Sequence, residues 1–313
     1  MKRLFLLTAV IALLCVGGIA QANVFLNDID YGVNLVGAIA AAGTDGVVEF
    51  RDNGSYSIAG QNHLTKAGVT VRSAAGYKAT ILATDGGTNS TFMLEAANIT
   101  FQNLNIVGTT YALGSGTYAF GFYGTKDSDY NYPTSGLTIQ DVAFSNVRGV
   151  IDAGSGWVKD LTFVNNTVTN TNYGLGKSGM NYGGGVVITG NTFINNGIGT
   201  GSGPQPAIWI EKNRGSLVID GNTFDNYNGR YAIYSNADLS ANPITLGTND
   251  FGTGIGGTGA LYNLYALQSG YAVGLMNAAS VQSGNPAVPE PMSIMLGIMG
   301  LGSVAGFRKL RRK

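Results

Sequence analysis

A recurring pattern of apolar and polar residues runs through the middle of this 313-residue chain. Each unit reads apolar-polar-apolar, then a small polar pair, then polar-apolar. The last apolar residue of the unit falls at positions 106, 144, 168, 193, 224 and 251. The intervals are 38, 24, 25, 31 and 27 residues, which indicates a period near 25 with insertions. A period of this length, without a strongly helical pattern between residues 44 and 253, predicts a solenoid of short strands.

Each unit predicts two strands with alternating faces, separated by a two-residue bend. The bend carries Gly190-Asn191 in one unit and Gly221-Asn222 in another, and these residue types tolerate left-handed backbone geometry. Asn195-Asn196 and Asn226 predict a second corner, where stacked asparagines can hydrogen-bond along the solenoid axis. A third strand follows that corner. The prediction is an all-β fold, a single-stranded parallel β-helix.

The first part of the pattern resembles the pectin-lyase-like family of right-handed parallel β-helices. Residues 46–56 (GVVEFRDNGSY) look like the opening strand and turn of that family, and residues 98–106 (NITFQNLNI) look like its first full rung. The resemblance extends over about residues 38–251 and implies a right-handed helix. The apolar, alanine-rich residues 33–42 predict a short helix that caps the N-terminal end of the core, where strand edges would otherwise be unpaired.

The N-terminus predicts a signal peptide over residues 1–22. Lys2 and Arg3 precede an apolar stretch over residues 4–20, and Ala20-Gln21-Ala22 is an A-x-A cleavage site for signal peptidase. The single cysteine, Cys15, lies inside this segment. The mature domain, residues 23–285, is therefore expected to have no disulfide and no thiol chemistry.

The C-terminus, residues 286–313, predicts a sorting tail. Pro289-Glu290-Pro291 precedes an apolar run over residues 292–307, which is followed by the basic residues 308–313. Sixteen helical residues span about 24 Å, which is slightly short of the roughly 30 Å of a bilayer core. An extension to Leu310, with Arg308 and Lys309 snorkelling to the interface, would make up the length, so we expect a transmembrane helix. The order of these features resembles the PEP-CTERM tail of Gram-negative bacteria. That resemblance implies recognition by an exosortase and a location in the cell envelope or extracellular matrix.

The formal net charge of zero hides an acidic domain. The chain has 18 basic and 18 acidic residues, but seven basic residues lie in the two removable ends. Residues 23–291 thus carry 18 − 7 = 11 basic and 18 acidic residues, a net charge of −7. An acidic exported domain is unsuited to binding nucleic acid.

Aligning the third strands places Asp152, Lys177 and Glu211 in one column. Read with the family resemblance, this column is a polysaccharide-lyase site, with Lys177 as the base and the two carboxylates as Ca²⁺ ligands. Lys212 and Arg214 would then bind substrate carboxylates. The other interpretation is a solvent-exposed ladder of alternating charges, which adds little stability.

A second column holds Tyr118, Arg148, Tyr173, Ala207 and Tyr231, and three of its members are tyrosines. These tyrosines can form an aromatic track for the sugar rings of an extracellular polysaccharide, because aromatic faces with hydroxyls suit glycans. The other interpretation is a set of ordinary tyrosines on the outside of the strands.

The motifs of the enzymes that share this fold are missing, and His63 is the one histidine. We therefore expect a non-catalytic protein of the cell surface or matrix that acts in adhesion, matrix structure or glycan binding, without a cofactor. The alternative is a divergent polysaccharide lyase that acts on uronic-acid glycans, for which Ca²⁺ is the expected cofactor. In both cases the C-terminal helix makes the membrane a partner.

Overall fold

The computed structural model describes residues 23–26, 34–84, 90–108, 116–123, 131–154, 156–199, 205–228, 231–237, 239, 242–252 and 261–263. The predicted signal peptide and the sorting tail, including Pro289-Glu290-Pro291, lie outside these residues. Within them, no helix is long and apolar enough to cross a membrane.

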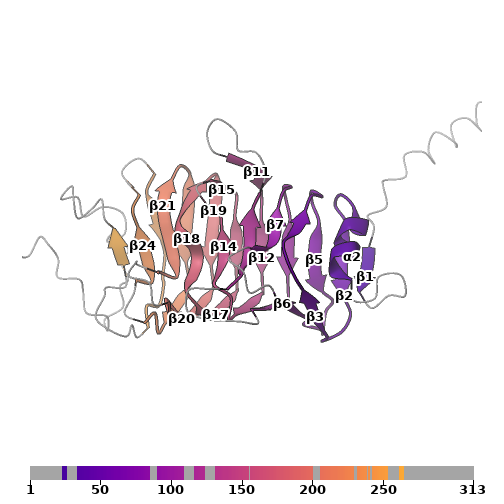
Figure 1. Cartoon of the computed structure of the whole chain (residues 1–313). Coiled ribbons are helices and arrows are strands. Elements are labelled where there is room, and N and C mark those ends of the chain that lie inside the picture. The colour runs from indigo at the N-terminus through magenta and orange to yellow at the C-terminus, as the bar shows by residue number, and fades with distance from the viewer. Residues whose placement is uncertain are drawn as a thin grey trace, which may run out of the picture.

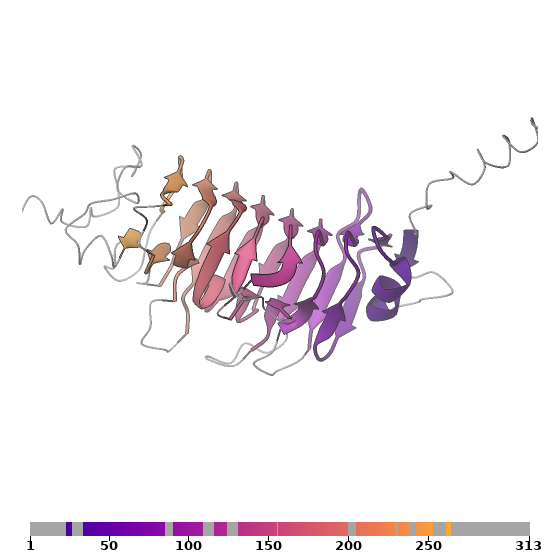
Figure 2. The ribbon, with the colours of Figure 1, turned by 90° about the horizontal axis from the view of Figure 1, so that it is seen from above.

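The strands wind into a right-handed parallel β-helix, as predicted. Successive turns stack along one axis, and each turn adds a strand to each of three parallel sheets (Figures 1 and 2). Sheet A contains β1 (Asn23–Leu26), β2 (Val47–Phe50), β5 (Thr70–Ser73), β8 (Thr100–Gln102), β12 (Thr138–Gln140), β16 (Thr162–Val164), β19 (Gly185–Thr189), β22 (Ser216–Asp220) and β25 (Ile244–Leu246). Sheet B contains β3 (Ser55–Ile58), β6 (Thr80–Ala83), β9 (Asn105–Gly108), β13 (Ala143–Ser145), β17 (Thr167–Thr171), β20 (Thr192–Asn196) and β23 (Thr223–Asp225).

Sheet C follows the second corner and carries the predicted third strands. It contains β4 (Asn62–Leu64), β7 (Ser90–Leu94), β10 (Tyr118–Phe122), β14 (Gly149–Asp152), β18 (Tyr173–Gly183), β21 (Ile208–Asn213), β24 (Ile233–Ser235) and β26 (Leu261–Asn263). Two further strands extend it sideways, β11 (Asn131–Ser135) and β15 (Trp157–Lys159). Because β18 is long, it pairs with both β14 and β15.

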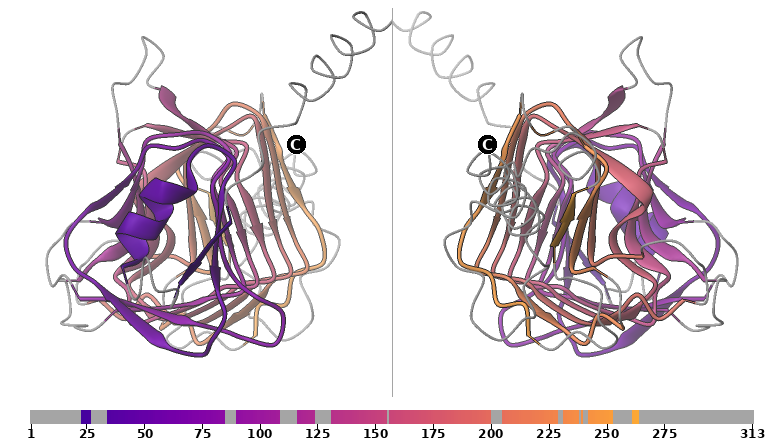
Figure 3. Two further views of the ribbon diagram at one scale, coloured as in Figure 1. Left: turned by 90° about the vertical axis from the view of Figure 1, so that its right-hand side faces the viewer. Right: turned by 90° about the vertical axis from the view of Figure 1, so that its left-hand side faces the viewer.

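The predicted N-terminal cap is the helix α2 (Leu35–Ala42), which lies across the first turn of the solenoid (Figure 3). Asn34 caps it, because the side-chain oxygen of Asn34 accepts a hydrogen bond from the backbone N–H of Gly37 at 3.0 Å. Leu35, Ala38 and Ile39 are buried on the face that covers the core. The helix thus shields the end of the apolar interior from water.

The core is a column of apolar side chains inside the three sheets. Inward-facing residues alternate with outward-facing ones along the strands. In β12, for example, Ile139 is buried in the core, and its neighbours Thr138 and Gln140 are half-buried. Phenylalanines stack on one another from turn to turn, with centroids 5.1–6.3 Å apart along the series Phe144, Phe163, Phe193, Phe224 and Phe251. Burial of these rings supplies much of the hydrophobic stabilisation.

Two asparagine ladders occupy the two predicted corners. The inner ladder is fully buried, and its side-chain amides bond from turn to turn through Asn166, Asn191, Asn222 and Asn249. The outer ladder runs through Asn146, Asn170, Asn195 and Asn226, and these four residues have positive φ angles. Gly190 and Gly221 also have positive φ, at 66° and 64°, which confirms the predicted left-handed bends.

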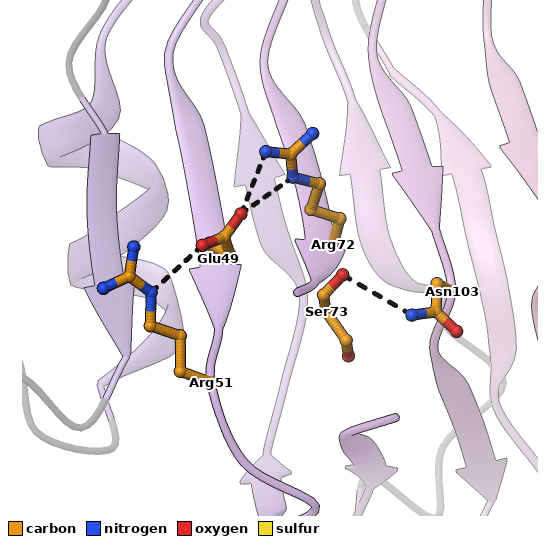
Figure 4. Close-up of polar contacts among 5 residues, drawn as sticks. All are labelled: Glu49, Arg51, Arg72, Ser73 and Asn103. Carbon is orange, nitrogen blue, oxygen red and sulfur yellow. Dashed lines mark hydrogen bonds and ion pairs between the residues drawn. The ribbon is translucent and has the colours of Figure 1, made fainter. Parts of the chain in front are cut away.

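An ion-pair cluster lies on the outer face of sheet A at its N-terminal end (Figure 4). Glu49 accepts hydrogen bonds from Arg51 at 3.1 Å and from Arg72 at 2.9 Å, and the Arg51 guanidinium lies 3.5 Å from the centre of the Phe25 ring. Burial by itself would raise the pKa of Glu49, but the two arginines outweigh it and hold the pKa below the usual value.

Replacing Glu49 with glutamine is expected to destabilise the fold by about 1 kcal/mol at pH 7, because the arginines are partly exposed and the pairs are screened by water. A lowered folded-state pKa gives stability that is present above the unfolded pKa and is lost as the pH falls through the folded pKa. The difference between Glu49→Gln and the wild-type protein should therefore shrink as the pH is lowered from 7 to 2, as measured by urea unfolding. An equal difference at pH 7 and pH 2 would contradict this assignment.

Candidate functional site

Four aromatic side chains form a cluster on sheet C near its C-terminal end. Tyr173 begins β18, Trp209 lies in β21, Tyr234 lies in β24, and Tyr231 precedes β24. The Trp209 ring centroid lies 6.5 Å from that of Tyr173 and 5.4 Å from that of Tyr234. The Tyr231 and Tyr234 centroids are 5.3 Å apart. All four side chains are half-buried, so the cluster is a continuous aromatic surface in contact with solvent.

Strand alternation turns this surface outward. Ile208 and Ile210 flank Trp209 and belong to the core, so Trp209 points to the opposite face. Trp209 pairs with Tyr234 in the neighbouring turn, and Tyr234 pairs in turn with Tyr262 of β26. Directly paired residues of adjacent strands are close enough for their side chains to pack. The register therefore places the side chains of Trp209 and Tyr234 next to each other in an aromatic column along the solenoid.

Polar groups lie beside the aromatic cluster. Asn236 donates a hydrogen bond to Glu211 at 2.8 Å, and these two residues follow Tyr234 and Trp209 by two positions each. The indole N–H of Trp209 is buried and has no hydrogen-bond partner. A buried donor without a partner costs about 1–3 kcal/mol. Aromatic faces together with amide and carboxylate groups form a surface suited to a ring-shaped ligand that carries hydroxyls.

Two of the three predicted tyrosines belong to this cluster, Tyr173 and Tyr231, and the third does not. Tyr118 is fully buried, so its predicted place on an exposed track is corrected. It pairs with Gly149, where an added Cβ would lie 3.0 Å from the Tyr118 ring. The absent side chain at Gly149 leaves room for this ring, and burial raises the pKa of the Tyr118 hydroxyl.

The predicted charged column does not form in the expected register. Leu175 pairs with Ile208 and Met180 pairs with Ile210, so residues 176–179 of β18 face a single residue of β21. Lys177 lies in this bulge. The catalytic role of Lys177 stays a prediction, but its expected stacking between Asp152 and Glu211 is corrected by the bulge.

The two predicted metal ligands have other partners. Asp152 pairs with Gly121 in register, and its carboxylate accepts a hydrogen bond from the backbone N–H of Gly154 at 3.0 Å. Glu211 accepts from Asn236. In the part of the chain that the structure describes, no three His, Cys, Asp or Glu side chains gather as a metal site would require. Binding of Ca²⁺ by Asp152 and Glu211 stays a prediction.

The predicted substrate-binding cations, Lys212 and Arg214, are both exposed at the end of β21. The Arg214 guanidinium lies 4.0 Å from the centre of the Trp157 ring. Sequence reasoning missed Trp157 as well as Trp209 and Tyr234. The neighbouring core residues Ile208, Ile210 and Ile233 could have shown that Trp209 and Tyr234 face outward. Residues next to a core residue in a strand point to the opposite face.

No family model matches the chain, and no curated protein matches it. Among solved structures, a pectin methylesterase in complex with a hexasaccharide is similar, with a TM-score of 0.46 and 11% sequence identity. The alignment covers 81% of this chain and 95% of that chain. The assignment of this chain as a parallel β-helix therefore rests on its own strand pairing.

Proposed function

We propose that this protein is a non-catalytic, exported β-helix protein of the bacterial cell surface or matrix, and that it contacts glycans through its aromatic cluster. The observation that carries the proposal is the outward column of Tyr173, Trp209 and Tyr234, extended by Tyr231. Tyrosine and tryptophan faces can pack on the apolar faces of sugar rings while polar neighbours bond the hydroxyls.

The direction of the column matters for the kind of ligand. Adjacent strands lie about 4.8 Å apart, so the three strands that carry Tyr173, Trp209 and Tyr234 span roughly 10 Å of the solenoid axis, with Trp209 and Tyr234 paired in register and Tyr173 displaced along its strand. That length corresponds to about two sugar rings, and Tyr262 continues the register by one strand. A linear polysaccharide that lies along the axis would contact several aromatic residues at once. The cluster thus favours a polymer over a single sugar.

The N-terminal and C-terminal signals place this surface outside the cell in our proposal. Signal peptidase would remove residues 1–22, and an exosortase would recognise Pro289-Glu290-Pro291. The basic end of residues 308–313 would keep the C-terminus of a transmembrane helix in the cytoplasm until sorting. The β-helix domain would then meet extracellular polysaccharide while the tail holds it at the membrane.

Replacing Trp209 with alanine is expected to weaken glycan binding at least tenfold without unfolding the protein, because Trp209 is the centre of the aromatic cluster. Retardation in native gels that contain a panel of neutral and acidic polysaccharides measures this. Tyr77→Ala is the matched control, because Tyr77 is 41% exposed and lies outside the cluster. Equal retardation of Trp209→Ala and the wild-type protein by every polysaccharide that the latter binds would refute the proposal.

A lyase assay is expected to give a flat trace. Incubation with pectate and alginate, with and without Ca²⁺, should produce no ultraviolet absorbance from unsaturated sugar ends. The reason is that Lys177 lies in a bulge of β18, outside the regular pairing that would align it with Asp152 and Glu211. A signal that Lys177→Ala abolishes would instead establish the lyase alternative, with Lys177 as the base.

A further inference from the structure

Three cations gather where the strands of sheet C end, next to the aromatic cluster. Lys159 ends β15, Lys212 lies in β21, and Arg214 follows β21. Both strands pair with β18: Lys159 pairs with Gly183, and Lys212 pairs with Asn181. The backbone N–H of Arg214 bonds to the carbonyl of Tyr182 at 2.9 Å, which holds Arg214 beside the same strand. We call Trp157, Lys159, Lys212 and Arg214 the cationic patch.

The patch is built on a tryptophan and a glycine. Trp157 is 3% exposed and lies beneath Arg214, whose guanidinium is 4.0 Å from the ring centre. An added Cβ at Gly183 would lie 3.4 Å from Cγ of Lys159 and 3.7 Å from the Trp157 ring, so both side chains lie over this glycine. Stacking fixes the plane of a guanidinium and leaves its N–H groups free at the edge. Arg214 is therefore oriented for an oxyanion.

Among the described residues, no ion pair joins Lys159, Lys212 or Arg214 to a carboxylate. The ion pairs of the described residues join Glu49 to two arginines and His63 to Glu95, all in the N-terminal turns. The acidic neighbours in sequence have other partners: Glu211 accepts from Asn236, and Asp160 accepts from the backbone N–H of Gly185 at 2.9 Å. The carboxylates of Asp160 and Glu211 keep their charges, but the three cations still form a local positive patch on a chain whose residues 23–291 carry a net charge of −7.

We propose that the cationic patch binds sulfate or phosphate ester groups of a polysaccharide. A single arginine satisfies a planar carboxylate through two parallel hydrogen bonds, whereas a tetrahedral oxyanion presents three oxygens to donors from several directions. Lys159 approaches from one side of β18, while Lys212 and Arg214 approach from the other. This arrangement matches a tetrahedral group better than a carboxylate.

The position of the patch identifies a polymer as its ligand. Trp209 and Lys212 lie on the same strand, three residues and about 10 Å apart. Because strands run across the solenoid axis, a side branch of a polymer that packs along the aromatic cluster would extend along β21 and reach the patch about two sugar lengths away. The glycan part of this inference rests on the proposed function, whereas the anion specificity rests on the patch alone.

Titration of the purified protein with dextran sulfate in low salt tests the inference, with uncharged dextran and polygalacturonate as comparison polymers. The double variant Lys159→Gln/Lys212→Gln is expected to bind dextran sulfate at least tenfold more weakly. For this variant, the slope of log K against log salt concentration should be smaller in magnitude by about two, because its binding releases about two fewer counterions. Arg214→Lys retains the charge but loses the fork of donors held on the Trp157 ring, so it should weaken binding of dextran sulfate without changing the salt slope. Lys66→Gln/Lys78→Gln is the matched control, because both lysines are exposed and the charge change is the same.

Several outcomes would overturn the inference. One is binding of dextran sulfate by Lys159→Gln/Lys212→Gln at wild-type strength, and another is an equal loss in the control variant. Wild-type affinity for polygalacturonate equal to that for dextran sulfate would refute the preference for a tetrahedral group. Patch-dependent binding to phosphatidylglycerol vesicles without binding to dextran sulfate would assign the patch to a lipid surface. Failure of Trp209→Ala to affect any polysaccharide would count against the proposed function, and not against the anion specificity of the patch.

Discussion

Replacing Phe193 with alanine is expected to destabilise the β-helix by about 3–5 kcal/mol, because the substitution leaves a cavity in a core that cannot collapse around it. The Phe193 ring is 1% exposed and lies between Phe163 at 6.3 Å and Phe224 at 5.1 Å. The rings of Phe193 and Phe224 are nearly parallel, at 5°. Urea unfolding followed by circular dichroism measures the loss.

Phe193→Leu is the matched control for this prediction. It keeps most of the apolar volume and should cost about 1.5 kcal/mol or less. A loss below 1 kcal/mol for Phe193→Ala would show that the ring stack contributes little. Because each turn of a solenoid contacts only its neighbours, the damage is also expected to be local, so limited proteolysis should cut near the altered turn before other turns.

The winding of the chain could be predicted from sequence because its signals are local. Alternation fixes which residues face inward, and residues with left-handed geometry mark the bends, as at Gly190 and Gly221. The asparagine ladders could be predicted from the same repeat. When successive turns stack, asparagines at equivalent corners lie on top of one another. The capping helix at Leu35–Ala42 followed from an apolar, alanine-rich stretch ahead of the first strand.

The register of sheet C could not be predicted in the same way. Residues 176–179 form a bulge in β18, and no repeat in the neighbouring strands marks these extra residues. The predicted alignment matched Ala207 with Tyr231, whereas Ile208 pairs with Ile233, a shift of one residue. A shift of one residue moves every side chain to the opposite face. Trp209 and Tyr234 were missed for this reason.

The burial of Tyr118 shows a different limit. The Tyr118 ring is buried in space that the paired residue of the next turn, Gly149, leaves open because it has no side chain. A sequence alignment of strands records which residues are paired, but it does not compare their sizes. The candidate site therefore kept two of its predicted tyrosines and gained two aromatic residues from the observed register.

Replacing Asn191 with leucine is expected to destabilise the protein by about 3–4 kcal/mol, although the two side chains are similar in size. Asn191 is 1% exposed, and its amide donates to the carbonyl of Phe163 at 2.8 Å and to Asn222 at 2.9 Å. Its oxygen accepts from the backbone and the side chain of Asn166, at 2.8 and 3.1 Å. Leucine would remove these side-chain partners from the carbonyl of Phe163 and the backbone N–H of Asn166, and each buried group left unsatisfied costs about 1–3 kcal/mol.

Urea unfolding again gives the magnitude, with Asn105→Leu as the matched control, because Asn105 is a half-buried asparagine on the outer side of β9. The control should change the free energy of unfolding by less than 1 kcal/mol. Asn191 and Asn222 share a hydrogen bond, so the double variant Asn191→Leu/Asn222→Leu should cost less than the sum of the single variants. Strictly additive losses would show that the corners act independently, and that the ladder does not couple successive turns.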